Sequence, residues 1–174
     1  LIDLDAVDVP PMDENKHPVL DYQSIVKNWP HGFDDETVRL TRAIYFAMLA
    51  ETDTILGRVI QKLEELGLDE TTWIVVCSDH GEMAMEHQDW YKMTMYEGSV
   101  RIPLLIAGPG VQAGAVVNQP VSLIDLHPTI TDMDGLKNSR DVDGESLMPL
   151  LKNPDTKHRE WVLATFTGSS MNTS

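Results

Sequence analysis

Trp73-Ile74-Val75-Val76-Cys77-Ser78-Asp79-His80-Gly81-Glu82 is the most informative segment of the chain, because an apolar run stops there at an acid, an imidazole and a glycine. The run 73–77 lacks polar alternation and is too short for a helix, so it predicts a strand buried on both faces, as in the centre of a parallel sheet. Ligand crevices in such sheets lie beyond the carboxyl ends of the strands, where Asp79 and His80 would emerge. A carboxylate beside an imidazole there indicates metal ligands, and Gly81 would allow the tight turn that brings them together. The alternative is an ordinary polar loop after a buried strand.

A long helix is predicted before this strand. Apolar residues recur at helical spacing from Thr37 to Leu66, with Asp34 or Asp35 to cap the start and Gly67 just past the end. We expect this helix to pack on the sheet. Gly57 in its interior predicts a close approach to a neighbouring element, because glycine is otherwise unfavourable there.

The predicted helix is followed by the predicted strand, which is the order of elements in an α/β fold. Residues 1–34 carry scattered prolines and no sustained period, which predicts an irregular surface segment. After the central stretch we expect strands at 104–107, 116–117 and 161–166. Asp125 is expected to cap a helix with Pro128 in its first turn, which Gly135 closes.

Composition excludes some classes of partner. The 174 residues carry a formal charge of -15, which argues against nucleic acid or an anionic membrane surface. No apolar run approaches the roughly 20 residues that a membrane helix needs. Cys77 is the single cysteine, so no internal disulfide is possible, and Asn172-Thr173-Ser174 fits a glycosylation acceptor. Because the chain opens on Leu1 without a methionine, we expect it to be a piece of a longer protein.

Several further motifs follow in a fixed order, and together they are more specific than any one of them. They are His17-Pro18-Val19, Tyr45-Phe46-Ala47-Met48, Asp79-His80-Gly81, Lys92, Tyr96-Glu97-Gly98, Ile102-Pro103-Leu104-Leu105, Gly108-Pro109-Gly110 and Ser122-Leu123-Ile124-Asp125. This set resembles the second half of the type I sulfatases, in the alkaline phosphatase superfamily. The resemblance implies part of an α/β three-layer sandwich with a mostly parallel central sheet, lacking its N-terminal half. Residues 35–152 would be the C-terminal part of that α/β domain, and 153–174 the start of a smaller subdomain.

The resemblance also implies roles for four residues. Asp79 and His80 match the late pair of ligands with which sulfatases hold one divalent ion, usually Ca²⁺. Calcium takes six to eight oxygens, so other ligands are needed, and the imidazole would also suit zinc. Lys92 matches the lysine that contacts the sulfate, although a loop lysine in water is the alternative. His87 in the same loop is expected to act as a proton donor or a substrate contact, since an imidazole changes charge near neutral pH.

The other half of the site is not found in the sequence. The nucleophile of the sulfatases is a formylglycine made from the cysteine of Cys-x-Pro-x-Arg, whereas Cys77 is followed by Ser78 and Asp79. An early pair of acids on a strand is also missing. Residues 1–174 alone are therefore expected to hydrolyse no ester, to bind calcium poorly and to aggregate through a partly uncovered helix face.

The function implied by the resemblance is hydrolysis of sulfuric esters. The partner would be a sulfated carbohydrate or a small sulfate ester, and the substrate a sulfated uronic acid of a glycosaminoglycan, in a lysosomal or secreted protein. One alternative is a phosphodiesterase or phosphonate hydrolase of the same superfamily, which would use two metal ions. The other is an acidic binding domain that keeps the fold without the chemistry.

Overall fold

The computed structural model describes residues 2–14, 16–27, 31–136 and 140–165. These residues form two compact units. The first unit holds 2–66 and His80–Ile102, and the second holds Gly67–Asp79 and 103–165. The acceptor triplet at Asn172 and Phe166 of the last expected strand lie outside the described residues.

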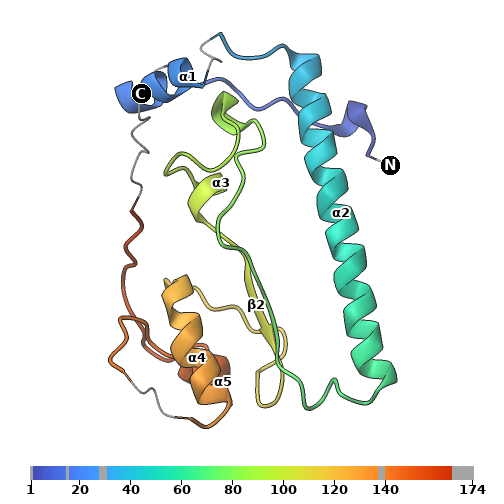
Figure 1. Cartoon of the computed structure of the whole chain (residues 1–174), viewed down its shortest axis with the longest axis vertical. Helices are drawn as coiled ribbons and strands as arrows, with labels where there is room; N and C mark the ends of the chain where they lie inside the picture. Colours follow the sequence, from blue (N-terminus) through green and yellow to red (C-terminus); the bar gives the residue numbers. More distant parts are fainter. Residues whose placement is uncertain (1, 15, 28–30, 137–139, 166–174) are drawn as a thin grey trace, which may run out of the picture. The chain divides into compact units, whose positions relative to one another are not determined.

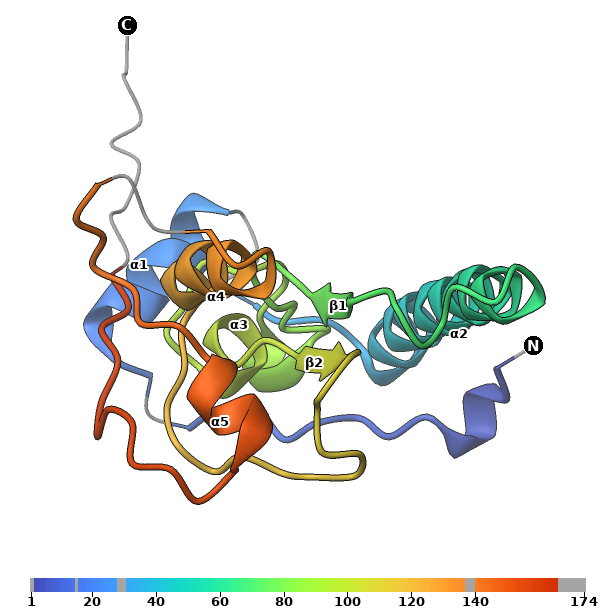
Figure 2. The ribbon, with the colours of Figure 1, turned by 90° about the horizontal axis from the view of Figure 1, so that it is seen from below.

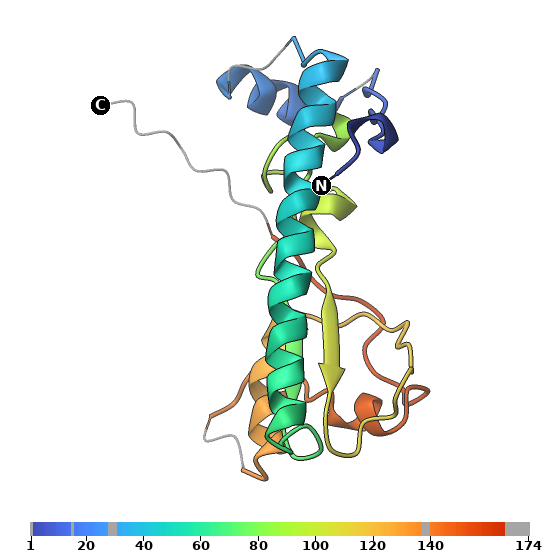
Figure 3. The ribbon, with the colours of Figure 1, turned by 90° about the vertical axis from the view of Figure 1, so that its right-hand side faces the viewer.

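The long helix of the first unit is confirmed. Helix α2 spans Asp35–Glu65 without interruption (Figure 3). It begins where the Asp34 carboxylate accepts a hydrogen bond from the Thr37 N–H at 2.7 Å, and the chain turns away after it at Gly67, with φ of 65°. Its buried residues, Val38, Arg42 and Ala43, lie near its start.

The remaining apolar face of α2 is largely exposed, as expected. Ile44, Ile55 and Val59 keep 54%, 50% and 53% of their surface accessible. The close approach predicted at Gly57 is not found among the described residues, because a Cβ built there has no atom within 4 Å. Along the described chain, none of the helices combines the length and the apolarity that crossing a membrane requires.

The described residues before position 35 are more regular than we predicted. They contain a 3₁₀ turn at Leu4–Ala6 and helix α1 at Pro18–Val26 (Figure 1). The error came from interpreting Pro18 as a breaker. Pro18 is the first residue of α1, where a missing N–H does no harm, and His17 Nδ1 accepts a hydrogen bond from the Val19 N–H at 3.3 Å.

The second unit contains the strand of the central stretch. Strand β1, Ile74–Cys77, pairs with β2, Leu104–Ala107, so that Ile74 lies opposite Ala107 and Cys77 opposite Leu104 (Figure 2). The pairing is antiparallel, and no parallel neighbour occurs among the described residues. Burial on both faces is also not observed, since β1 is half-buried and Leu105 of β2 is 61% exposed. Two strands alone cannot cover their own faces, so the expected parallel sheet needs other strands.

Two further expected strands do not form in the described residues. Residues 116–117 and 161–165 have no strand structure, because an extended segment becomes a strand only when its backbone pairs with another. The expected helix is present as α4, Leu126–Met133, with Pro128 in its first turn. Gly135 follows it with φ of 66°, and α4 contacts the short helix α5, Met148–Lys152.

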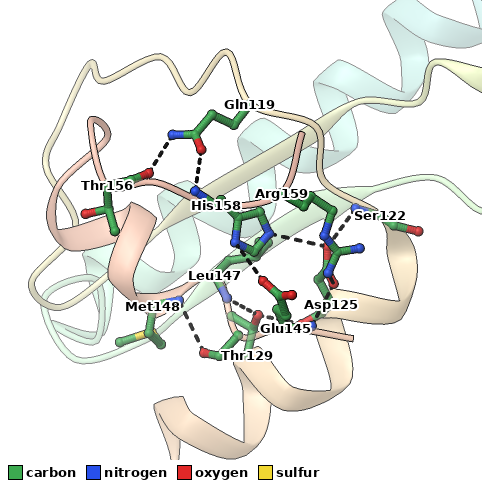
Figure 4. A network of polar contacts seen from close by, with 11 residues as sticks. Gln119, Ser122, Asp125, Thr129, Glu145, Leu147, Met148, Thr156, His158 and Arg159 are labelled. Atoms are coloured by element: carbon green, nitrogen blue, oxygen red, sulfur yellow. Dashed lines mark hydrogen bonds and ion pairs between the residues drawn. The ribbon is translucent and has the colours of Figure 1, made fainter. Parts of the chain in front are cut away.

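The second unit is organised around the buried carboxylate of Asp125 (Figure 4). One oxygen accepts the N–H of Ser122 at 2.8 Å, and the other accepts the N–H of Glu145 at 2.9 Å. Arg159 Nη2 lies 2.6 Å from that second oxygen. The buried ring of His158 lies beside them, with Nδ1 3.4 Å from Glu145 Oε2. Asp125 thus joins three segments of this unit through one side chain.

Candidate functional site

Asp79 and His80 follow β1 directly, as the sequence predicted. Asp79 is exposed and is the last residue of its segment in the second unit, whereas His80 is half-buried and begins the segment His80–Ile102 of the first. The two proposed metal ligands therefore lie where the chain passes from one unit to the other. Their convergence on one ion stays a prediction.

The ring of His80 is oriented by the neighbouring backbone. Nδ1 lies 2.8 Å from the carbonyl oxygen of Gly81. A carbonyl can only accept, so Nδ1 must carry the proton, and in the neutral ring the lone pair is on Nε2. Metal-binding histidines are held in one tautomer by this kind of contact.

Gly81 is required for close packing rather than for an unusual backbone angle. It does not have a positive φ, but a Cβ built on it would lie 2.0 Å from the carbonyl oxygen of Gly98. The Gly81 N–H donates to the Ser99 carbonyl at 2.8 Å. The segment after His80 is thus fixed against the start of α3, Glu97–Val100.

The loop that follows has a strained backbone. Every non-glycine residue with positive φ in the described chain lies between positions 84 and 91, and these residues are Ala84, Met85, His87, Gln88 and Tyr91. Such conformations are costly and persist only where the surroundings impose them. They occur most often at functional sites, which makes this loop the strongest structural candidate for one.

Glu82 and Arg42 both hold this conformation through hydrogen bonds to the loop backbone. Glu82 Oε1 accepts the N–H of Tyr91 at 2.7 Å and that of Ala84 at 3.2 Å. Arg42, buried on α2, donates from Nη1 to the Ala84 carbonyl at 2.8 Å and pairs with Asp8 at 3.1 Å. A charged side chain thus replaces the backbone partners that a regular element would supply.

Lys92 lies at the end of this loop. Its side chain is exposed, and its carbonyl accepts a hydrogen bond from the Ser99 hydroxyl at 2.7 Å. Ser99 is buried in α3, so the backbone of Lys92 is anchored while its ammonium faces solvent. This arrangement is compatible with both interpretations of Lys92, the anion contact and the solvated lysine.

His87 is the most constrained of the predicted site residues. Its Nδ1 lies 2.8 Å from Asp13 Oδ2, and its ring stacks on Tyr96 with centroids 3.8 Å apart and planes inclined by 3°. The Tyr96 hydroxyl donates to the same Oδ2 at 2.7 Å. The hydrogen bond from His87, with that from Tyr96, holds the pKa of Asp13 below its usual value. Burial and the bond to Asp13 raise the pKa of Tyr96 to about 12.

Comparison with known proteins identifies the family to which this site belongs. The sulfatase family profile matches residues 10–136, which is more than half of the chain. The chain belongs to the sulfatase family. Arylsulfatase K of Bos taurus is 42% identical over 183 residues, which cover 99% of this chain and 34% of the relative.

Two solved structures are similar to this chain in sequence and fold. The phosphonate monoester hydrolase SpPMH from Silicibacter pomeroyi matches with a TM-score of 0.80 and 35% identity, over 92% of this chain and 34% of that one. BT4656, solved with its substrate D-glucosamine-2-N,6-O-disulfate, matches with a TM-score of 0.68 and 28% identity. The match covers 87% of this chain and 32% of BT4656. The expected family and the partial α/β fold are confirmed. The chain spans about a third of the length of these relatives.

The sulfatase family implies a divalent metal ion, and Asp79 and His80 have ligand chemistry that fits one. His80 presents the tautomer with its lone pair on Nε2, and Asp79 supplies a carboxylate. Within the described residues, no three His, Cys, Asp or Glu side chains gather as a metal site would require. This pair would therefore be only part of a coordination shell.

Sequence reasoning missed Asp13, Glu82 and Arg42. Asp13 and Arg42 act on the 84–91 loop across long separations, 74 residues to His87 and 42 to Ala84, whereas Glu82 acts from close by in the sequence. Spacing along a chain does not reveal such contacts. One usable signal was Glu82 itself, a carboxylate directly after the Asp79-His80-Gly81 turn.

Proposed function

We propose that this chain is part of a sulfuric ester hydrolase and supplies two metal ligands and the sulfate-contacting residues of its site. The observation that carries the proposal is the strained loop 84–91. It joins His80 to Lys92 and holds His87, and two buried or half-buried charged residues fix its backbone. The match of the sulfatase profile over 10–136 includes this whole segment.

Each residue then has a role that its surroundings support. Asp79 and His80 would hold one divalent ion, Ca²⁺ by family resemblance, which when bound would polarise the sulfate oxygens. Lys92 would place its ammonium against the sulfate, where it stabilises the negative charge that builds up as the ester bond breaks. His87 would contact the substrate or donate a proton to the leaving group. The nucleophile, a formylglycine, would come from outside residues 1–174.

The proposed substrate is a sulfated sugar of a glycosaminoglycan, with a sulfated uronic acid as the first candidate. The similarity of this chain to arylsulfatase K and to BT4656, whose substrate is a disulfated glucosamine, supports this class of substrate. An acidic chain with a formal charge of -15 needs local cations for a polyanion, and Lys92 is exposed at the site. A lysosomal or secreted location is part of the same proposal.

The full-length protein tests this function directly. We expect calcium-dependent hydrolysis of an aryl sulfate and a loss on the order of 10²–10³ in kcat for Lys92→Ala. Lys152→Ala, an exposed lysine of α5, is the matched control and should keep full activity. Parent kinetics in the Lys92 variant would remove Lys92 from the site. A folded parent that binds no metal and cleaves no ester would favour the non-catalytic binding domain.

A phosphonate or phosphate ester hydrolase is the second candidate, because SpPMH matches with a TM-score of 0.80. The two functions differ in substrate and, by resemblance, in metal count. An aryl phosphonate and an aryl phosphate assayed beside the aryl sulfate would separate them. Preference for the phosphorus esters, with two metal ions per chain, would establish the second candidate over the first.

A further inference from the structure

The segment before α1 holds the site loop at one residue, His87, through two separate contacts. Asp13 Oδ2 lies 2.8 Å from the ring Nδ1 of His87, and Lys16 Nζ donates to the His87 carbonyl at 2.7 Å. His87 has φ of 56°, so its backbone needs such support. Residues of a segment that we predicted to be irregular therefore fix both the ring and the backbone of a proposed site residue.

The contact with Asp13 determines which ring nitrogen of His87 carries a proton. The pKa of Asp13 is lowered, chiefly by the hydrogen bond with His87, so the carboxylate is ionised at neutral pH and can only accept. Nδ1 must therefore be the donor, and the lone pair of the neutral ring is on Nε2. Among the described residues, no group forms a hydrogen bond with Nε2, and the side chain is 34% exposed.

Tyr96 removes the remaining freedom of the ring. Its hydroxyl donates to the oxygen of Asp13 that also binds His87, and its ring stacks on the imidazole at 3.8 Å. A ring held at one nitrogen and along one face cannot rotate without breaking a contact. Lys16 and Asp89 are two further charged groups that lie near His87.

We propose that Asp13 is a positioning residue for His87, which it holds with Nδ1 protonated so that Nε2 is presented to the substrate. Tyr96 assists by fixing the ring plane. This inference rests on the proposed function for the role of His87, and on the structure alone for the tautomer. Asp13 acts through His87 and needs no contact with substrate.

A double-mutant cycle in the full-length protein tests this inference. We expect Asp13→Asn to lower kcat/KM for an aryl sulfate on the order of tenfold and to change the shape of its pH profile. In a His87→Asn background the same change should have almost no further effect, because the two residues act as a unit. Glu14→Gln is the matched control, an exposed acid one position away that should leave kcat/KM unchanged. Losses that add across the cycle would overturn the proposal.

The tautomer is measured independently of activity. Nitrogen NMR of the parent should show His87 protonated at Nδ1 in its neutral form, with a shift toward Nε2 protonation in Asp13→Asn. If the parent cleaves no sulfate ester, the proposed function fails, yet the NMR result still decides the role of Asp13. An unchanged tautomer in the variant would overturn the inference whatever the activity. Should Asp13→Asn fail to fold, Tyr96→Phe keeps the carboxylate and should loosen the ring, seen as a broadened or shifted His87 signal.

Discussion

The aromatic ring of Tyr96 lies parallel to the imidazole of His87, with centroids 3.8 Å apart and an angle of 3° between the planes. Tyr96 caps α3, whereas His87 lies in the strained loop before it. Both side chains bind the same carboxylate oxygen, Asp13 Oδ2. Three segments of the first unit therefore meet at one oxygen, and several consequences can be measured.

Tyr96 should make the stability of the protein sensitive to alkali. Its pKa is raised to about 12, first by burial and then by the hydrogen bond to Asp13. Between about pH 10 and 12 the phenol is ionised in the unfolded chain but neutral in the folded one, so stability falls as pH rises through that window. Between pH 9 and 11 the free energy of unfolding, measured with urea, should fall less in Tyr96→Phe than in the parent, by on the order of 1 kcal/mol after allowance for partial exposure. Tyr22→Phe, 66% exposed on α1, should behave like the parent. Equal falls in all three proteins would contradict the prediction.

The buried carboxylate of Asp89 should lower the free energy of unfolding at neutral pH. It is 5% exposed, and its Oδ2 has no hydrogen-bond partner among the described residues. Burial raises its pKa, so the ionised form is penalised in the folded state and stability is lost as pH rises above about 4. Asp89→Asn should raise the free energy of unfolding at pH 7 by about 1 kcal/mol, and the gain should shrink near pH 4. Asp53→Asn, exposed on α2, is the control. A destabilised Asp89→Asn would contradict the prediction.

Replacing Gly81 or Gly57 with alanine should change the stability of the protein in opposite directions. A Cβ at Gly81 would lie 2.0 Å from the Gly98 carbonyl oxygen. This is a backbone atom, which can move away only at a large cost in free energy. Gly81→Ala should therefore lose about 1–3 kcal/mol or more and displace the His80 turn, with reduced activity. Gly57→Ala fills open space in a helix and should gain roughly 0.5–1 kcal/mol. Thermal unfolding of both variants compares the two effects, and a neutral Gly81→Ala would show that α3 can move.

Asp125→Asn should weaken the second unit severely. Both carboxylate oxygens accept backbone N–H groups, from Ser122 and Glu145, whereas an amide offers one acceptor oxygen and a second donor. The substitution also leaves Arg159, 15% exposed, without its counter-charge. We expect a loss of about 3–5 kcal/mol in chemical denaturation. Asp155→Asn, an exposed acid of the same unit, should change stability little. A loss below about 1 kcal/mol would show that Asp125 is not the organising residue.

Elements whose signals are local could be predicted from the order of residues alone. The helical period and caps predicted α2 to within two residues at its start, and the apolar runs predicted β1 and β2. The ordered motifs indicated the family, which the profile over 10–136 confirmed. These features depend on neighbours along the chain, and so they can be recognised without a fold.

Contacts between distant residues, in contrast, could be recognised only in the folded chain. Strand direction, the close approach at Gly81 and the contacts of His87 with Asp13 all depend on segments that are far apart in sequence. The expected strands at 116–117 and 161–165 do not form because an extended backbone needs a partner, and the sequence does not say which partner it has. Hydrogen bonds between remote side chains have no periodicity along the chain. For that physical reason the contacts of Asp13 and Arg42 with the site loop became visible only once the chain was folded.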